Sequence, residues 1–227
     1  MKTIYLALGL GLVTLSRAAA QQPIGYQINL DLQNVQNDRV RVVINTPAIK
    51  EQQATYVIPS VVPGSYSKKD YGRFVTDFKA FDKQGKRLKT RNSGPNLFLI
   101  DDAKKLARLE YLVDDTWDAK QDDSFIFQPG GTNIEAGRNF TINHYGFYGY
   151  LEGYKMEPYQ VSVLKPAALY GATALDVRRE SATKDVFTAP NYVTLADGPS
   201  CTPSPIRPVS APAGRASRWR YFRKRAW

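Results

Sequence analysis

Apolar and polar residues alternate in short stretches along most of this chain. Residues 26–32 (YQINLDL) and 39–44 (RVRVVI) have the two-residue period of strands that are buried on one face. Residues 34–38 between them are rich in asparagine and aspartate, which favour turns. We therefore predict that these two strands form an antiparallel hairpin.

The stretch from Tyr56 to Phe81 is the one around which the rest of the chain is organised. It begins as a strand (YVI), breaks at Pro59 and at Pro63-Gly64, and continues through a polar loop into a second apolar run. That run fits one face of a helix or a strand, and the turn sequence DKQG at 82–85 favours the strand. A loop held by Pro-Gly at one end and by aromatic residues at the other is stiff, and binding residues often lie on such loops.

Strand and turn signals recur about every ten residues through the rest of the chain, without a convincing long helix. Residues 106–113 also allow a helix. The pattern predicts an all-β domain, built as an antiparallel sandwich or a barrel-like sheet. Further strands are expected at 87–90, 95–100, 106–113, 125–127, 139–143, 159–164 and 175–177.

Aromatic residues and glycines are interleaved in residues 144–154 (HYGFYGYLEGY). One interpretation is an aromatic platform for a ligand. The other is a hairpin of packed aromatic side chains, in which the glycines form bulges or turns. Composition favours the packed hairpin, and it also favours a packed or hydrogen-bonded role for His144 over a catalytic one.

The first 20 residues have the pattern of a secretory signal peptide. Lys2 precedes an apolar run over residues 4–15, and three alanines at 18–20 precede Gln21. The run is shorter than the roughly 20 residues that a membrane-spanning helix needs. We therefore expect a cleaved signal, no stable membrane anchor, and export to the periplasm or the extracellular space.

Charge is distributed unevenly along the chain, although the formal net charge is +10. Residues 200–227 contain seven basic residues and no acidic one, whereas the body at 21–199 is nearly balanced. The body therefore gives no charge argument for binding nucleic acid. Residues 200–227 are also rich in proline, alanine and serine, so we expect a disordered basic tail, which is either an interaction segment or a frameshift product. The abrupt change at Ser200 favours the frameshift.

No catalytic constellation is present in the sequence. His144 is the only histidine and Cys201 the only cysteine, so a zinc site of clustered histidines and cysteines is excluded. No Gly-x-Ser-x-Gly turn and no glycine-rich phosphate loop occur. Aspartate pairs at 101–102, 114–115 and 122–123 are candidates for calcium binding or acid–base chemistry, but solvated turns are the favoured interpretation.

Three ordered segments resemble one protein family. Residues 61–75 (VVPGSYSKKDYGRFV) are similar to the Pro-Gly-Ser-Tyr…Asp-Tyr/Phe-x-Arg segment of the N-terminal domain of glycyl aminopeptidase-type zinc peptidases, family M61. Residues 143–166 and 187–199 resemble later parts of the same domain, so the resemblance covers roughly residues 25–199.

The resemblance implies a β-rich, saddle-like domain that precedes a helical, thermolysin-like catalytic domain. There a His-Glu-x-x-His helix and a later glutamate would bind zinc, but no position of this sequence matches them. It therefore implies a chain truncated before its active site, with no cofactor of its own. Tyr66, Asp70 and Arg73 would contact peptide substrate or the missing catalytic domain. Alternatively, Arg73 pairs with Asp70 or Asp77, and Tyr66 only packs.

Two functions follow from these observations. The first is the non-catalytic N-terminal β domain of an exported zinc aminopeptidase-like protein, with residues 1–20 as signal, 21–199 as domain and 200–227 as tail. The second is a stand-alone exported β-sandwich module that binds peptide or glycan through its aromatic loops. A severed domain would expose an apolar patch around residues 189–199 and would associate through it, whereas a module would be polar there.

Overall fold

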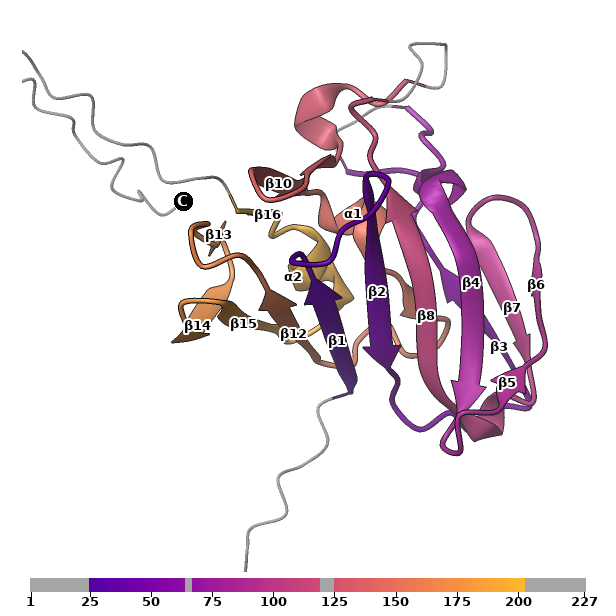
Figure 1. Cartoon of the computed structure of the whole chain (residues 1–227). Coiled ribbons are helices and arrows are strands. Elements are labelled where there is room, and N and C mark those ends of the chain that lie inside the picture. Colours follow the sequence, from indigo (N-terminus) through magenta and orange to yellow (C-terminus); the bar gives the residue numbers. More distant parts are fainter. Residues whose placement is uncertain (1–24, 64–66, 119–124, 203–227) are drawn as a thin grey trace, which may run out of the picture.

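The computed structural model describes residues 25–63, 67–118 and 125–202 (Figure 1). Of these residues, 46% are in strands and 11% in helices, which confirms the all-β prediction. The expected signal peptide at 1–20 and most of the expected tail lie outside the described residues.

Sixteen strands and five short helices form the described chain. The strands are β1 (Tyr26–Asp31), β2 (Arg39–Asn45), β3 (Gln53–Val57), β4 (Val75–Asp82), β5 (Arg87–Leu88), β6 (Thr90–Asn92), β7 (Leu97–Asp101), β8 (Leu106–Asp114), β9 (Asn133–Glu135), β10 (Asn139–Ile142), β11 (Tyr150–Leu151), β12 (Tyr159–Leu164), β13 (Ala172–Thr173), β14 (Asp176–Ser181), β15 (Lys184–Ala189) and β16 (Ser200–Cys201). The helices are η1 (Tyr71–Phe74), η2 (Ala103–Lys105), η3 (Gln128–Gly130), α1 (His144–Phe147) and α2 (Tyr192–Ala196).

The largest sheet has eight strands in the order β14-β15-β12-β1-β2-β8-β4-β5 (Figure 1). β1 and β2 pair antiparallel, with Ile28 opposite Ile44, so the predicted hairpin is confirmed. On its other side β1 pairs in parallel with β12, with Tyr26 opposite Tyr159. A purely antiparallel sheet is therefore wrong at this pair, because β12 returns to β1 by a long connection and not by a hairpin.

The apolar run of the central stretch forms strand β4, as its alternation and the following turn predicted. Its end pairs with β5, with Ala80 opposite Leu88. The turn between them contains Gly85 at φ 79°, a conformation that glycine adopts without the steric cost of a side chain.

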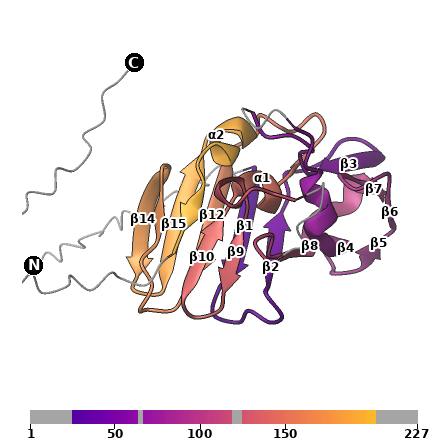
Figure 2. The same ribbon diagram turned by 90° about the horizontal axis from the view of Figure 1, so that it is seen from above.

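A second sheet, β11-β3-β7-β6, packs against the large sheet through aromatic side chains. Phe78 of β4 stacks on Phe98 of β7 with ring centroids 4.4 Å apart. Tyr56 of β3 contacts Tyr111 of β8 at 5.9 Å. Figure 2 shows α1 and α2 on one face of the large sheet, so the core lies between that face and these smaller elements.

The folded chain continues past the boundary expected at Pro199. Strand β16 pairs with β10 and β13, which form a third sheet with β9 in the order β13-β16-β10-β9. The backbone N–H of Thr202 donates to the carbonyl of Phe140 at 2.8 Å. Disorder from Ser200 onward is therefore wrong for residues 200–202, because strands distant in sequence supply their hydrogen bonds.

The aromatic–glycine segment is packed inside the protein, but it is not the hairpin that was predicted. Helix α1 begins it and strand β11 follows. His144, Phe147 and Tyr148 are fully buried, so the packed interpretation is confirmed for these side chains. A Cβ atom on Gly149 would lie 2.1 Å from the carbonyl oxygen of Val57, so only glycine fits there.

Tyrosine hydroxyls from the surrounding core satisfy the backbone of residues 147–151, much of which has no strand partner. Such buried N–H and C=O groups would otherwise carry a desolvation cost. The Tyr26 hydroxyl accepts from the N–H of Leu151, and the Tyr56 hydroxyl accepts from the N–H of Gly149. Three further hydroxyls donate to carbonyls: Tyr111 to Phe147, Tyr192 to Tyr148 and Tyr159 to Gly149.

One member of the aspartate pairs differs from the solvated turn that was expected. Asp115 is buried, and its carboxylate accepts from the backbone N–H groups of Trp117, Asp118 and Ile134. Burial raises the pKa of this carboxyl group above its usual value. The side chain therefore joins the start of the β8–β9 connection to strand β9, while Asp122 and Asp123 lie outside the described residues.

Candidate interdomain surface

The loop between β3 and η1 is closed at its base by two backbone hydrogen bonds. The N–H groups of Lys69 and Asp70 both donate to the carbonyl of Ser60, at 2.7 and 3.0 Å. The Lys69 ammonium also donates to the carbonyl of Phe125 at 2.9 Å, which ties this loop to the β8–β9 connection. The predicted contact residue Tyr66 lies outside the described residues.

Asp70 organises the base of this loop. Its φ of 50° is a left-handed conformation, and its carboxylate accepts from the Asn96 side chain at 2.6 Å. Lys68 lies 3.4 Å from the same oxygen. The other end of the Asn96 side chain accepts from the N–H of Gly72 at 2.9 Å. Sequence reasoning missed Asn96, because nothing local marks it as the partner of a loop 26 residues away.

Arg73 lies in the same helical turn as Asp70 and has an exposed side chain. Its Nε donates to the carbonyl of Lys69 at 3.2 Å, and its guanidinium lies 4.4 Å from the centroid of the Phe74 ring. The structure thus brings Asp70 and Arg73 together at the loop base. Asp70 and Asp77 each form an ion pair with a lysine, Asp70 with Lys68 and Asp77 with Lys79.

A groove of about 340 Å³ lies beside this loop; we call it the α2 groove. Its walls come from the β3–η1 loop, from α1 and β11, and from α2. Val61 and Val193 on its edges are 46% and 53% exposed. The lining residues are Val57, Pro59, Ser60, Val61, Pro63, Tyr145, Tyr150, Lys155, Tyr192, Val193 and Ala196.

Two asparagine caps position the helices that flank the groove. The side-chain oxygen of Asn143 accepts from the N–H of Tyr145 at the start of α1. That of Asn191 accepts from the N–H of Thr194 at the start of α2. Such caps satisfy N–H groups that have no partner within the helix. Within α2, Tyr192 is buried and the next residue, Val193, is exposed to solvent.

The lining of the α2 groove is mostly apolar and aromatic, with Ser60 and Lys155 among its polar members. Among the described lining residues Lys155 is the one that carries a charge, and none is a carboxylate. The Lys155 ammonium lies 5.1 Å from the centroid of the Tyr150 ring. Exposed apolar surface of this kind is typical of a contact with another protein surface and offers no acid–base pair for chemistry.

His144 lies in the core below the groove. Its Nδ1 donates to the carbonyl of Leu195 at 2.8 Å, so Nε2 accepts from the hydroxyl of Ser200 at 3.0 Å. Burial lowers the pKa of His144 to about 4, which keeps the ring neutral at pH 7. The favoured packed role is therefore confirmed.

Within the described part of the chain, no group of three or more histidine, cysteine, aspartate or glutamate side chains is placed to hold a metal ion. None of the described helices is long and apolar enough to cross a membrane.

The family model for the peptidase M61 N-terminal domain matches residues 27–202. The chain belongs to this family. The match includes strand β16 (Ser200–Cys201) of the third sheet. No curated relative matches this M61 N-terminal domain in sequence.

Among solved structures, the domain is similar to an aminopeptidase N family protein from Idiomarina loihiensis, with a TM-score of 0.66 and 17% identity over 78% of this chain and 29% of that chain. An M1 zinc metallopeptidase from Deinococcus radiodurans matches with a TM-score of 0.39 and 14% identity, over 79% of this chain and 41% of that one. The similarity to the Idiomarina loihiensis protein shows the fold of this domain. The chain spans less than half the length of either protein.

Proposed function

We propose that this M61 N-terminal domain is a non-catalytic part of an exported zinc aminopeptidase-type peptidase, and that the α2 groove packs against the catalytic domain of that enzyme. The observation that carries the proposal is the exposed apolar groove with Val61 and Val193 on its edges.

Peptide hydrolysis would come from the partner domain. The sequence has a single histidine, and that residue is buried and hydrogen-bonded at both ring nitrogens. Zinc and the general base would accordingly belong to the catalytic domain. Asp70 and Arg73 lie at the base of the loop next to the groove, where the exposed Arg73 guanidinium would contact that domain or the peptide.

Binding of peptide or glycan by a stand-alone module is the alternative. It would need the aromatic side chains of residues 144–154 on the surface, whereas His144, Phe147 and Tyr148 are buried. The partly exposed Tyr145 and Tyr150 line the α2 groove. A ligand that binds through Tyr145 and Tyr150 would occupy the same groove, so the two functions are distinguished by which partner the chain binds.

The test is binding between the purified mature chain and an M61 catalytic domain expressed without its own N-terminal domain, measured by calorimetry. We expect measurable binding that Val193→Asp weakens at least tenfold. Val177→Asp is the matched control, because Val177 is a 38% exposed valine on β14, away from the groove. Equal binding by both variants would contradict the proposed interface.

Hydrolysis of glycyl and other aminoacyl p-nitroanilides, measured with added zinc, provides the second readout. The mature chain alone is expected to show none. Saturable binding of short peptides or oligosaccharides by the chain, without any affinity for the catalytic domain, would favour the stand-alone module.

Export is part of the proposal and has its own test. Expression of the full chain in a bacterial host, followed by N-terminal sequencing of the product outside the cytoplasm, is expected to give Gln21 as the first residue. A product that retains Met1 in the cytoplasm would contradict export.

A further inference from the structure

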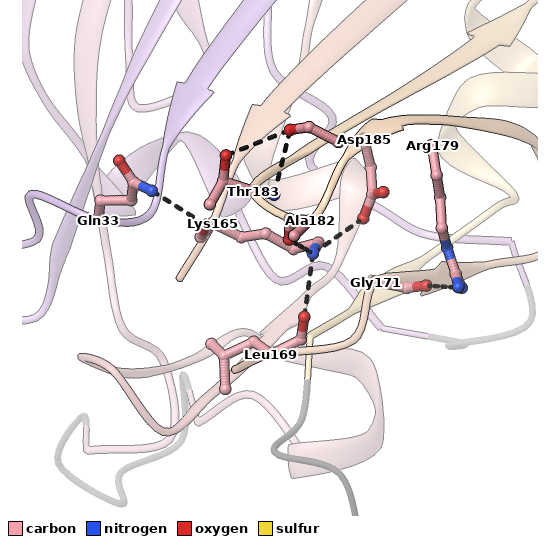
Figure 3. A network of polar contacts seen from close by, with 9 residues as sticks. Gln33, Lys165, Leu169, Gly171, Arg179, Ala182, Thr183 and Asp185 are labelled. Atoms are coloured by element: carbon pink, nitrogen blue, oxygen red, sulfur yellow. Dashed lines mark hydrogen bonds and ion pairs between the residues drawn. The ribbon is translucent and has the colours of Figure 1, made fainter. Parts of the chain in front are cut away.

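A buried ion pair lies where β12 ends, beside strand β15 (Figure 3). Lys165 and Asp185 are 4% exposed each, and the Lys165 ammonium lies 3.7 Å from Asp185 Oδ2. The ammonium donates to the carbonyls of Leu169 and Ala182, at 3.0 and 2.7 Å. Two of its three protons are therefore directed to carbonyls, and 3.7 Å is too long for a hydrogen bond to the carboxylate.

Both carboxylate oxygens of Asp185 lack a hydrogen-bond partner among the described residues. A buried carboxylate that accepts no hydrogen bond is unusual, because ionised oxygens lose strong bonds to water on burial. The hydroxyl of Thr202, which is 5% exposed, is likewise without a partner among these residues.

These two side chains line the same small cavity, of about 20 Å³, under strand β16. One water molecule needs roughly 15 Å³ of such space and two or more polar partners. The other hydroxyls of the lining are engaged, since Ser200 bonds His144 and Thr173 donates to the carbonyl of Gly198. Asp185 and Thr202 are thus the groups left to bind a solvent molecule.

We propose that one internal water molecule occupies this cavity, donates to the Asp185 carboxylate and accepts from the Thr202 hydroxyl. A metal cation suits the site poorly, because the Lys165 ammonium already supplies the positive charge beside the carboxylate. The water connects the last described residue of the chain to the ion pair that joins β12 and β15.

A crystal structure of the mature chain tests the site directly. The expected result is a density peak about 2.8 Å from both an Asp185 oxygen and the Thr202 hydroxyl oxygen. An atom with several oxygen distances near 2.4 Å would be a cation, and a carboxylate bonded only by protein groups would leave no role for water. Either finding would overturn the proposal.

Magnetic relaxation dispersion of the water nuclei, which counts long-lived internal water molecules, tests the bridge in solution. Thr202→Val is expected to lose one such molecule relative to the wild type. Thr202→Ser keeps the hydroxyl and is expected to retain it, so the Ser variant separates loss of the bond from misfolding. Thr188→Val, at an exposed position of β15, is the matched control and should leave the count unchanged. An unchanged count in Thr202→Val would refute the bridge.

Discussion

Tyr111 illustrates, at the scale of single residues, how a polar group organises the core. Its buried hydroxyl donates to the carbonyl of Phe147 at 2.8 Å and lies 2.9 Å from the hydroxyl of Tyr56. Burial raises the pKa of this phenol well above its usual value, which favours the protonated hydroxyl that donates the bond. The hydroxyl therefore satisfies a buried carbonyl at the end of helix α1.

Replacing Tyr111 by phenylalanine is expected to lower the free energy of unfolding by about 2 kcal/mol, because the Phe147 carbonyl would stay buried without its donor. Urea denaturation measures the change. Tyr170→Phe is the control, since Tyr170 is 50% exposed, and it should change stability by less than about 0.5 kcal/mol. Equal effects of the two substitutions would show that the buried hydroxyl contributes nothing specific.

His144 makes stability depend on pH. Its pKa is about 4 in the folded protein, against 6.5 for an unperturbed histidine, because burial disfavours the charged ring. The unfolded chain therefore binds the proton first as pH falls. The contribution of His144 to stability is complete above pH 6.5 and is lost progressively down to pH 4, by about 3 kcal/mol in total.

Denaturation curves at pH 7, 5.5 and 4 measure this loss. His144→Phe removes the titrating group and keeps an aromatic ring against Phe187, so its stability is expected to fall less steeply over the same range. It should be less stable than the wild type at pH 7, because Leu195 and Ser200 lose a partner. Identical pH slopes for the two proteins would exclude His144 as the cause.

Gly149 sets the packing between two elements, strand β11 and strand β3. An alanine Cβ there would lie 2.1 Å from the Val57 carbonyl oxygen, so Gly149→Ala must separate the strands. The expected loss of stability is about 3 kcal/mol. Gly130→Ala is the matched control, because its Cβ would meet only the Tyr71 hydroxyl at 3.8 Å. Thermal melts distinguish the two, and a Gly149→Ala protein that melts like the wild type would contradict this close approach of the backbones.

Local alternation predicted some strands well, but it missed β15, although its partner β14 directly precedes it in sequence. The hairpin of residues 26–44 and the strand after Phe74 were both evident from alternation and turn residues. Pairing between distant segments was not, as the parallel contact of β1 with β12 and the strand at Ser200 show. Local sequence determines that a segment is extended, whereas its neighbours depend on how the whole chain collapses.

At the scale of the whole molecule, the α2 groove should control self-association. We expected exposed apolar surface around residues 189–199, and the structure places Val193, 53% exposed, at the groove within that range. The mature chain is therefore expected to associate at high concentration when no partner covers the groove. Analytical ultracentrifugation should show Val193→Asp to be more monomeric than the wild type and than Val177→Asp. A monomeric wild-type chain would mean that the groove does not cause self-association.

The candidate site was only partly accessible to sequence reasoning. The structure places Asp70 and Arg73 one helical turn apart at the loop base, and their contact with substrate or with the catalytic domain stays a prediction. The groove was missed, since its walls come from four segments between Val57 and Ala196 that no local pattern connects. The aromatic residues of its walls were noticed, but which of them face outward depends on the short helices α1 and α2.

The sequence by itself determined the all-β character of the chain, its first hairpin and its family, because alternation, turn residues and ordered motifs are local properties. The tertiary structure settled which aromatic side chains are buried and which strands pair across long separations. It also decided that Asp185 and Thr202 share a cavity. These outcomes depend on contacts between distant residues, whose energies arise only when the core has formed.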